Sequence, residues 1–313
     1  MEGYLFYGKV CLLLPSLNKI NNYSKKMQKK NIKRSQLSVI ILTYNEKENI
    51  AQALDSVISW SDEVIILDSY SVDGTLDIVS NYECNLYQHN FENFSKQRNY
   101  ALKDIPIKNE WILFLDADEW VTEELKVEID AFLESNPTEN GAYLNRKFLW
   151  MGKWIKRGYY PTWTLRLFRH KESYCEDRSV NEHIVVSGEL TKLKNHYIHQ
   201  DQKSIGDWIS KHNARATLEA DELYKRDCKI IQKEISVKLF GNQVERKRWI
   251  RYYFWEKIPI LIRPILYFLF RYVFKMGFLD GKRAFTYHFL QALWFPMLID
   301  IKYLEKKLKK NYE

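Results

Sequence analysis

The 313-residue sequence predicts an α/β fold with a Rossmann-like parallel sheet, followed by a helical segment at the carboxyl end. Two observations predict the sheet. An apolar run, a polar turn and a stretch with helical spacing follow one another twice, and a third apolar run then ends in carboxylates. Such alternation of strand and helix signals is typical of βαβ units. The third observation is a basic, strongly aromatic tail, which predicts separate helices.

The first strand–helix unit is expected over residues 37–60. Residues 37–44 (L-S-V-I-I-L-T-Y) are rich in β-branched side chains, and Ile50, Leu54 and Val57 have the spacing of one helix face. Open α/β sheets bind their ligands at the carboxyl ends of the strands. The polar residues at that position here are Thr43, Tyr44, Asn45 and Glu46.

The second unit repeats this arrangement over residues 64–79. An apolar run from Val64 to Leu67 precedes a polar turn that begins with Asp68 and Ser69 and contains Gly74. Helical spacing resumes over residues 76–79. Consecutive strands that all end in polar clusters indicate one site at the sheet edge rather than unrelated surface turns.

The third strand is the most informative feature of the chain. The apolar run 111–115 ends in Asp116, Ala117, Asp118 and Glu119, and a run of this kind predicts a buried strand of a parallel sheet. Two Asp at positions i and i+2 of a strand point the same way, so Asp116 and Asp118 can share one cation. Carboxylate oxygens suit Mg²⁺ or Mn²⁺, which commonly also bind substrate phosphates. The alternative is a solvated strand end.

Cysteine content and charge narrow the class of protein. The four cysteines are widely spaced and form no C-x-x-C motif, so neither a zinc site nor a disulfide framework is indicated, as expected in a reducing cytoplasm. Residues 246–313 hold fifteen Lys or Arg against five Asp or Glu, and residues 1–36 hold eight against one. With a total net charge of +8, residues 37–245 therefore carry about −9. An acidic core argues against a nucleic acid partner, whereas basic, aromatic ends favour an anionic membrane surface.

The tail contains two apolar stretches, 248–274 and 285–301. Cations such as Arg263 and Arg271 interrupt the first, so no charge-free run approaches the ~20 residues that span a bilayer. Interleaved Trp, Tyr and cations favour an interfacial helix pair, which would hold the protein peripherally on the inner face of the cytoplasmic membrane. The alternative is a helix pair that packs on the core or forms a homo-oligomer.

Motifs along the first half of the chain resemble those of family 2 glycosyltransferases with the GT-A fold. These motifs are Thr43-Tyr44-Asn45-Glu46, the turn from Asp68 to Thr75, Lys96-Gln97-Arg98-Asn99 and Asp116-Ala117-Asp118. Later residues resemble one branch, the lipopolysaccharide core glycosyltransferases of the WaaE/KdtX type: Arg166 to Arg169, Val180-Asn181-Glu182, His199, Lys211 and residues 277–281. The resemblance covers roughly residues 37–285. The chain departs from the usual Asp-Asp-Gly-Ser at Asp68-Ser69-Tyr70-Ser71, and from the usual Val-His-Glu at Val180-Asn181-Glu182.

The resemblance implies an inverting transfer of a sugar from a nucleoside diphosphate donor to a lipopolysaccharide core or another lipid-linked glycan. It implies that Asp118 binds the metal directly and that Asp116 bridges the ribose and the metal. It also implies that His199 completes the contact to metal or diphosphate, with His196 as the local competitor. For the catalytic base it favours Glu182, with Asp177 as the runner-up.

The nucleotide would lie against residues 43–46, which can contact uracil and ribose, and against the Asp68–Ser69 turn, where Asp68 can accept from a base N–H. Arg98 would reach the diphosphate or the base. These features favour a UDP-sugar, such as UDP-glucose or a related hexose donor, over a CMP-linked donor, and they leave GDP open.

Two other features leave function and packing equally open. Arg166 and Arg169 are expected on one face of a strand, facing either phosphate or solvent. The aromatic and basic segment from Trp150 to Trp163 suggests a sugar-stacking surface or a lid, or else ordinary packing below a long loop. A structural helix is expected over residues 204–226.

The predicted organisation has three parts. Residues 1–36 form a basic extension expected to be disordered, residues 37–245 form the GT-A catalytic domain with halves at 37–140 and 141–245, and residues 246–313 form the membrane-associating tail. The alternative to an enzyme is a non-catalytic glycan-binding or scaffold protein with the same fold at a membrane surface. A nucleotidyltransferase would need a Gly-rich loop with a Lys after the first strand, which residues 43–46 lack.

Overall fold

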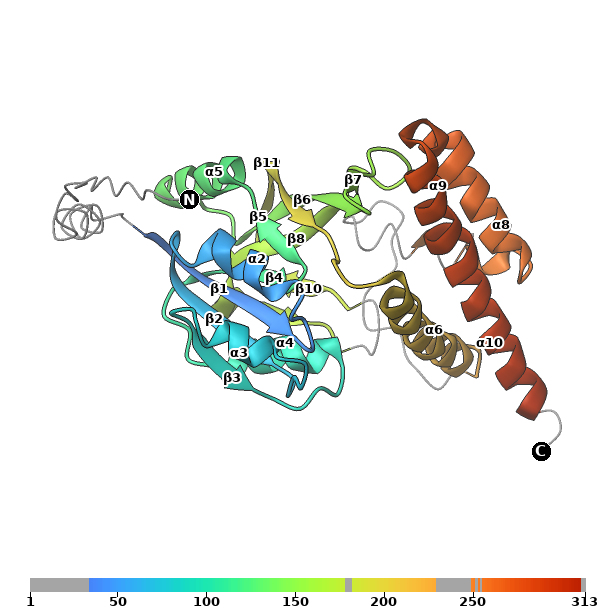
Figure 1. Ribbon diagram of the computed structural model, residues 1–313, viewed down its shortest axis with the longest axis horizontal. Coiled ribbons are helices and arrows are strands. Elements are labelled where there is room, and N and C mark those ends of the chain that lie inside the picture. The colour runs from blue at the N-terminus through green and yellow to red at the C-terminus, as the bar shows by residue number, and fades with distance from the viewer. Residues whose placement is uncertain (1–33, 178–181, 229–248, 251–252, 254, 311–313) are drawn as a thin grey trace, which may run out of the picture. The chain divides into compact units, whose positions relative to one another are not determined.

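A mixed sheet organises the first two thirds of the chain (Figure 1). The computed structural model describes residues 34–177, 182–228, 249–250, 253 and 255–310, and the described residues from Ser35 onward form one compact unit. Within the described residues the strand order is β3-β2-β1-β4-β8-β6-β11-β5, with β7 beside β6. The predicted α/β class is confirmed. The expected extension 1–36 and the predicted boundary at residue 245 fall almost entirely outside the described residues.

The strands predicted over residues 37–44, 64–67 and 111–115 are present close to those positions, and the sequence patterns gave no bounds for the other strands. The sheet contains β1 (Ser35–Thr43), β2 (Ser61–Asp68), β3 (Asn85–Gln88), β4 (Trp111–Asp116), β5 (Glu119–Val121), β6 (Gly141–Trp150), β7 (Lys153–Trp154), β8 (Trp163–Arg169) and β11 (Leu190–His199). A separate antiparallel pair consists of β9 (Ser173–Cys175) and β10 (Ile184–Val186).

The parallel half of the sheet brings three strand ends together. Strand β1 pairs in parallel with β2 on one side and with β4 on the other. The register places Thr43 opposite Asp68 and Leu42 opposite Asp116. Because the three strands run the same way and end level, their polar carboxyl ends share one edge of the sheet, as the sequence predicts.

Helices cover both faces of this half. The helices are α2 (Ile50–Val57), α3 (Thr75–Val79), α4 (Phe94–Lys103) and α5 (Glu123–Glu134). Alternate residues of a strand face opposite sides, so Val39 and Ile41 pack with α2 and α5, whereas Ile40 packs with Ala101 and Leu102 of α4. The side chains of Asn93 and Thr122 accept from backbone N–H groups of the first turn and so begin α4 and α5.

The described part of the carboxyl-terminal third is helical. It comprises α6 (Ile205–Asp227), α8 (Ile262–Leu269), α9 (Lys282–His288) and α10 (Phe295–Lys310), with wide helical turns at Phe270–Phe274 and Phe289–Trp294. The predicted helix over residues 204–226 is confirmed as α6, which starts with a capping box between Ser204 and Asp207. Helix α6 packs along α10 through small and aromatic residues such as Ala216 and Phe295.

A small aromatic core joins this third to the sheet. Trp150 ends β6, Ile155 follows β7, Trp208 lies on α6 and Tyr287 lies on α9, and all four are buried together. Trp150 Nε1 also donates to Thr286 Oγ1 at 3.0 Å. No helix in the part of the chain that the structure describes is long and apolar enough to cross a membrane.

Candidate active site

The loops that follow β1 and β2 are fastened to each other by side chain–backbone hydrogen bonds. Asn45 N–H donates to Ser71 Oγ, and Val72 N–H donates to Asn45 Oδ1, both at 2.8 Å. Glu46 N–H donates to Thr75 Oγ1 at 2.8 Å. Asn45 has φ of +53°, a left-handed conformation that Asn tolerates better than most residues. Residues predicted to meet the nucleotide therefore sit on a preformed double loop, on which Tyr44 is exposed.

Asp68 and Ser69 form the base of this double loop. Asp68 is fully buried and accepts from Ser71 N–H at 2.9 Å, from the Ser71 hydroxyl and from Gln88 Nε2 at 3.1 Å. Ser69 N–H donates to the Thr43 carbonyl, and Ser69 Oγ accepts from Gln97. These contacts show Asp68 shaping the loop, whereas its contact with a base N–H stays a prediction.

The D-A-D edge carries a network of alternating charges. Asp116 is held by Arg166 at 2.7 Å and by Arg98 at 3.3 Å. The same Arg166 nitrogen lies 2.7 Å from Glu119 Oε1, and Glu119 is fully buried. Glu119 Oε2 in turn accepts from the Asp116 backbone N–H. The network fixes the direction of both carboxylates at the end of β4, while Ala117 lies buried between Asp116 and Asp118.

The arginines keep Asp116 ionised. Desolvation would raise the pKa of Asp116, but the charge of Arg166, followed by that of Arg98, outweighs it and holds the pKa well below its ordinary value. The pKa of Arg166 also shifts so that the charged form is favoured. Desolvation would lower this pKa, but the charges of Asp116 and Glu119 raise it well above its usual range. The pair therefore stays charged at any physiological pH.

Asp118 and His199 are the residues best placed to hold a divalent cation. Asp118 Oδ2 lies 3.4 Å from His199 Nε2. Ligands of Mg²⁺ or Mn²⁺ lie about 2.0–2.2 Å from the ion, so two adjacent ligands of an octahedron are about 3 Å apart, and this pair fits. Behind the imidazole, Glu119 Oε1 lies 3.5 Å from His199 Nδ1, which makes no hydrogen bond to it in this structure although a carboxylate at this side commonly orients a metal-binding histidine.

The two residues supply an open rather than a complete metal site. Within the described residues no group of three or more His, Cys, Asp or Glu side chains is arranged to hold a metal. Asp116, the predicted third ligand, is engaged by arginines. Two protein ligands leave room for diphosphate oxygens and water, which is how Mg²⁺ is commonly bound at phosphate sites. His196, three residues away and so on the other face of β11, lies 2.8 Å from the Tyr160 hydroxyl.

Glu182 reaches this network through Arg98. The amide of Asn99 pairs with both backbone groups of Cys175, which ties α4 to β9. Because β9 pairs with β10, the residues just before β10 return to α4, and Glu182 forms an ion pair with Arg98. Asp177, the runner-up as base, is exposed, and residues 178–181 lie outside the described part of the chain.

Two lysines from the region of α6 lie at the site: Lys211, which the sequence singled out only through the resemblance and without a role, and Lys203, which it missed. Lys203 Nζ lies 2.8 Å from Glu46 Oε1. Burial raises the pKa of Glu46, although Lys211, Lys203 and Asn49 oppose the rise. Desolvation would lower the pKa of Lys211, but Asp118, then Glu46 and Asp201, raise it. These contacts arise from tertiary packing: Gln202 N–H donates to Asn49 Oδ1 at 2.8 Å and thereby brings this segment to the first loop.

One expectation about β8 is wrong. Arg166 and Arg169 do not share a face, because residues three apart on a strand point to opposite sides. Arg166 enters the carboxylate network, whereas Arg169 pairs with Glu110 and stacks over Trp111 near the start of β4.

The aromatic segment 150–163 is engaged mainly by the carboxyl-terminal helices. Arg157 binds Asp280 through its backbone N–H at 2.8 Å and its guanidinium at 2.7 Å. Arg271 donates to the Gly158 carbonyl and lies 4.4 Å from the centre of the Tyr159 ring. Packing therefore accounts for most of this segment, while Lys147 and Lys156 lie over the ring of Trp154.

Comparison with known proteins returns glycosyltransferases. Residues 38–177 match Glycosyl transferase family 2. An uncharacterized glycosyltransferase of Rickettsia prowazekii is 28% identical over 206 residues, which cover 62% of this chain and 70% of that protein. The poly(ribitol-phosphate) beta-N-acetylglucosaminyltransferase TarS of Staphylococcus aureus is 33% identical over 113 residues, 33% of this chain and 19% of that protein.

A solved structure shows the same fold. The mannosyltransferase PcManGT from Pyrobaculum calidifontis, in complex with GDP-Man and Mn²⁺, superposes with a TM-score of 0.50 over 93% of this chain and 95% of its own. The two sequences are 16% identical, so the likeness concerns the fold.

Proposed function

We propose that this chain, a glycosyltransferase with a family 2 domain at residues 38–177, moves a hexose from a UDP-sugar to a lipid-linked surface glycan such as a lipopolysaccharide core. The transfer would invert the anomeric centre in one displacement. The resemblance of the later motifs to the WaaE/KdtX branch motivates this acceptor class. The proposed donor is UDP-glucose or a related UDP-hexose. A GDP-sugar is the alternative donor, which the Pyrobaculum complex with GDP-Man suggests.

One observation carries the proposal. The carboxyl ends of β1, β2 and β4 lie level at one sheet edge, and Asp118 meets His199 there beside a network of ionised side chains. A nucleoside diphosphate needs such a combination: a loop for the nucleoside, and cationic groups with a metal for the phosphates.

Different side chains would perform the separate steps of the proposed transfer. Asp118 and His199 would hold Mg²⁺ or Mn²⁺, which neutralises charge on the departing diphosphate. Lys203 and Lys211 place two further cations beside Glu46 and Asp118, where the same charge would develop. Glu182 would take the proton of the acceptor hydroxyl, and Arg98 would connect this base to the diphosphate side of the site.

The proposed location follows from the acceptor and from composition. A lipid-linked acceptor lies at a membrane, and the basic, aromatic tail suits an anionic surface. We therefore place the protein in the cytoplasm, peripherally on the inner face of the cytoplasmic membrane.

Donor cleavage tests the proposal. The purified protein is offered UDP-glucose, UDP-galactose, UDP-GlcNAc and GDP-mannose with Mn²⁺, with and without EDTA, and release of the nucleoside diphosphate is measured. We expect metal-dependent release from one donor and its loss in Asp118→Ala. If no donor is cleaved and calorimetry detects no binding of UDP or GDP, the proposal is wrong. Binding without cleavage would favour the scaffold alternative unless an added lipid-linked acceptor restores turnover.

A matched pair of variants tests the base. Glu182→Gln and Asp177→Asn remove one negative charge each from positions five residues apart. We expect Glu182→Gln to lower transfer to an acceptor strongly while UDP binding persists, because Glu182 is proposed to act on the acceptor hydroxyl and not on the nucleotide. We expect Asp177→Asn to retain transfer, and the reverse result would reassign the base to Asp177.

A further inference from the structure

Helix α8 and the turn after it carry their apolar side chains on the outside. Seven large apolar residues are exposed at the spacing of a single helix face: Ile262, Ile265, Leu266, Leu269, Phe270, Val273 and Phe274. Phe274 is the most exposed of them, at 77%. A surface helix of a globular protein normally turns such a stripe toward the core. Here the stripe faces away from the protein.

The cations of the same helix are turned inward. Arg263 is buried and binds Asp300 of α10 through Nε at 2.9 Å. Arg271 donates to the Gly158 carbonyl and lies against the rings of Tyr159 and Tyr267. Arg263 and Arg271, which interrupt the apolar run in the sequence, therefore do not interrupt the stripe on the surface.

Neighbouring segments extend this surface. The 3-10 turn Gly277–Asp280 packs against the turn Phe270–Phe274 and against α9, and it exposes Phe278 and Leu279. Phe285 of α9 is exposed and lies 5.5 Å, ring centre to ring centre, from Tyr272. We call this combined surface, from Ile262 to Phe289, the apolar face.

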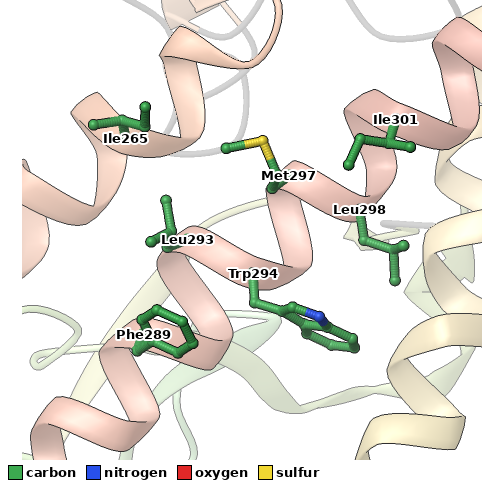
Figure 2. A pocket seen from close by; sticks show the side chains of 7 residues that line it. All are labelled: Ile265, Phe289, Leu293, Trp294, Met297, Leu298 and Ile301. Carbon is green, nitrogen blue, oxygen red and sulfur yellow. The ribbon is translucent and has the colours of Figure 1, made fainter.

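A groove opens beside the apolar face (Figure 2). Figure 2 shows Ile265 of α8 across from a series of apolar side chains that runs from Phe289 to Ile301 on the neighbouring helix. The groove has a volume of about 380 Å³, and each of its seven lining residues is apolar. Ile265 and Phe289 belong to both features, so the groove and the face are continuous.

The exposed charged side chains of the segment that forms the apolar face are all positive. Among residues 260–290, all of them described, Asp280 is the single acidic residue, and it is buried against Arg157. Lys275, Lys282 and Arg283 are exposed. An apolar surface bordered by cations matches an anionic membrane surface, whose headgroups attract Lys and Arg while its acyl region accepts the apolar side chains.

We propose that the apolar face is inserted into the interface of an anionic lipid bilayer, with Phe274 and its neighbours below the headgroups. Exposed apolar patches of this extent mark interaction surfaces on soluble proteins, and the surrounding positive charge selects lipid over a neutral partner. The inference deepens the proposed function, on which it rests for the idea of a lipid-linked acceptor, by assigning the residues that contact the lipid.

Vesicle flotation with the full-length protein tests this assignment. Vesicles of phosphatidylcholine alone are compared with vesicles that also contain phosphatidylglycerol, at low and high salt. We expect binding to the anionic vesicles, weakened by salt, and at least about tenfold weaker binding for Phe274→Glu, because burial of an aromatic side chain then becomes burial of a charge. Val127→Glu, at a 70% exposed position of α5, is the matched control and should bind like the wild type.

The outcomes separate this inference from the proposed function. Wild-type binding that Phe274→Glu does not weaken, or no binding to anionic vesicles, would overturn the assignment. A dimer in solution that Phe274→Glu dissociates, without vesicle binding, would instead show a contact between two copies. Nucleoside diphosphate binding without vesicles should be equal in wild type and Phe274→Glu, which shows that the variant is folded. Failed donor cleavage with intact vesicle binding would count against the proposed function and leave the apolar face assigned.

Discussion

The sheet edge and helix α8 use buried charge for opposite purposes. At the sheet edge, Arg166 and Glu119 are buried around Asp116 and Asp118, so that charge is gathered where a ligand would bind. In the carboxyl-terminal helices, Arg263 and Asp300 are buried as a pair, and apolar side chains lie on the outer surface. The comparison teaches that burial of an ion pair does not by itself identify a functional site. The groups that lie beside the pair identify the site. These are candidate metal-binding side chains at the sheet edge and exposed apolar side chains on α8.

The largest effect is expected at Arg166. In Arg166→Met the buried carboxylate of Glu119 loses its cation, and removal of one partner of a buried pair costs about 3–5 kcal/mol of unfolding free energy. Urea unfolding at pH 7 measures the loss. The double variant Arg166→Met/Glu119→Leu should regain stability without regaining donor cleavage, since Asp116 and His199 still lack their support. Recovery of both properties would show that the network is structural only.

The same design at Arg263 sharpens the contrast. Arg263→Met should also cost about 3–5 kcal/mol, since Asp300 then stays buried alone. Arg263→Met/Asp300→Leu replaces the pair with apolar groups, which is often neutral for stability. Here donor cleavage should be normal in the double variant, in contrast to its counterpart at the sheet edge. Loss of cleavage in a stable double variant would contradict a purely structural role for this pair.

Removal of the imidazole at position 199 should have an intermediate effect. We expect His199→Ala to lower the affinity for Mn²⁺ about 10- to 100-fold, a typical effect of substitutions around metal ligands. A Mn²⁺ titration of donor cleavage measures this change. His196→Ala is the control on the same strand, and it should leave the Mn²⁺ titration unchanged because His196 contacts Tyr160. Equal effects of the two variants would argue against a metal at Asp118.

The smallest effect concerns pH. Burial raises the pKa of Glu46, so the folded protein prefers the protonated form, and this contribution to stability is present below the unfolded pKa and lost as pH rises through the folded pKa. Asp116 behaves in the opposite sense, because its lowered pKa gives a contribution that is lost only as pH falls well below 3.8.

Glu46→Gln should therefore gain stability relative to wild type as pH rises above 4.5, by much less than the ~3–5 kcal/mol expected at Arg166. Urea unfolding of both proteins at several pH values from 4 to 8 measures the difference. A constant difference across this range would show that Glu46 titrates as an exposed residue does.

Local pattern predicted the part of the site that lies on consecutive strands. Thr43, Asp68 and Asp116 each end a strand, and parallel pairing alone brings them together. Pattern could not reveal that Arg166 binds Glu119 or that Lys203 binds Glu46, because these contacts depend on where β8 and the α6 entry pack in three dimensions. The Arg169 prediction failed for a local reason, the parity of residues on a strand.

For the carboxyl-terminal tail, the sequence predicted the character of the surface but not which side chains form it. Its composition predicted helices and an interfacial character, but Arg263 and Arg271 read as interruptions of the apolar surface. Their side chains turn inward because Asp300 and the Gly158 carbonyl receive them, and those partners lie 37 and 113 residues away in the chain. Which face of α8 is the outer one could not be known without them.

The shared aromatic core has a consequence for how this chain can be cut or recombined. Trp150 and Ile155 are covered by Ala284 and Tyr287, so a fragment that stops near residue 245 would expose these two apolar side chains to solvent. A swap of the tail between relatives would need to carry the partner residues of the β6–β8 connection with it. Substitutions in the segment 150–155 should therefore be accompanied, among relatives, by substitutions in the segment 284–287.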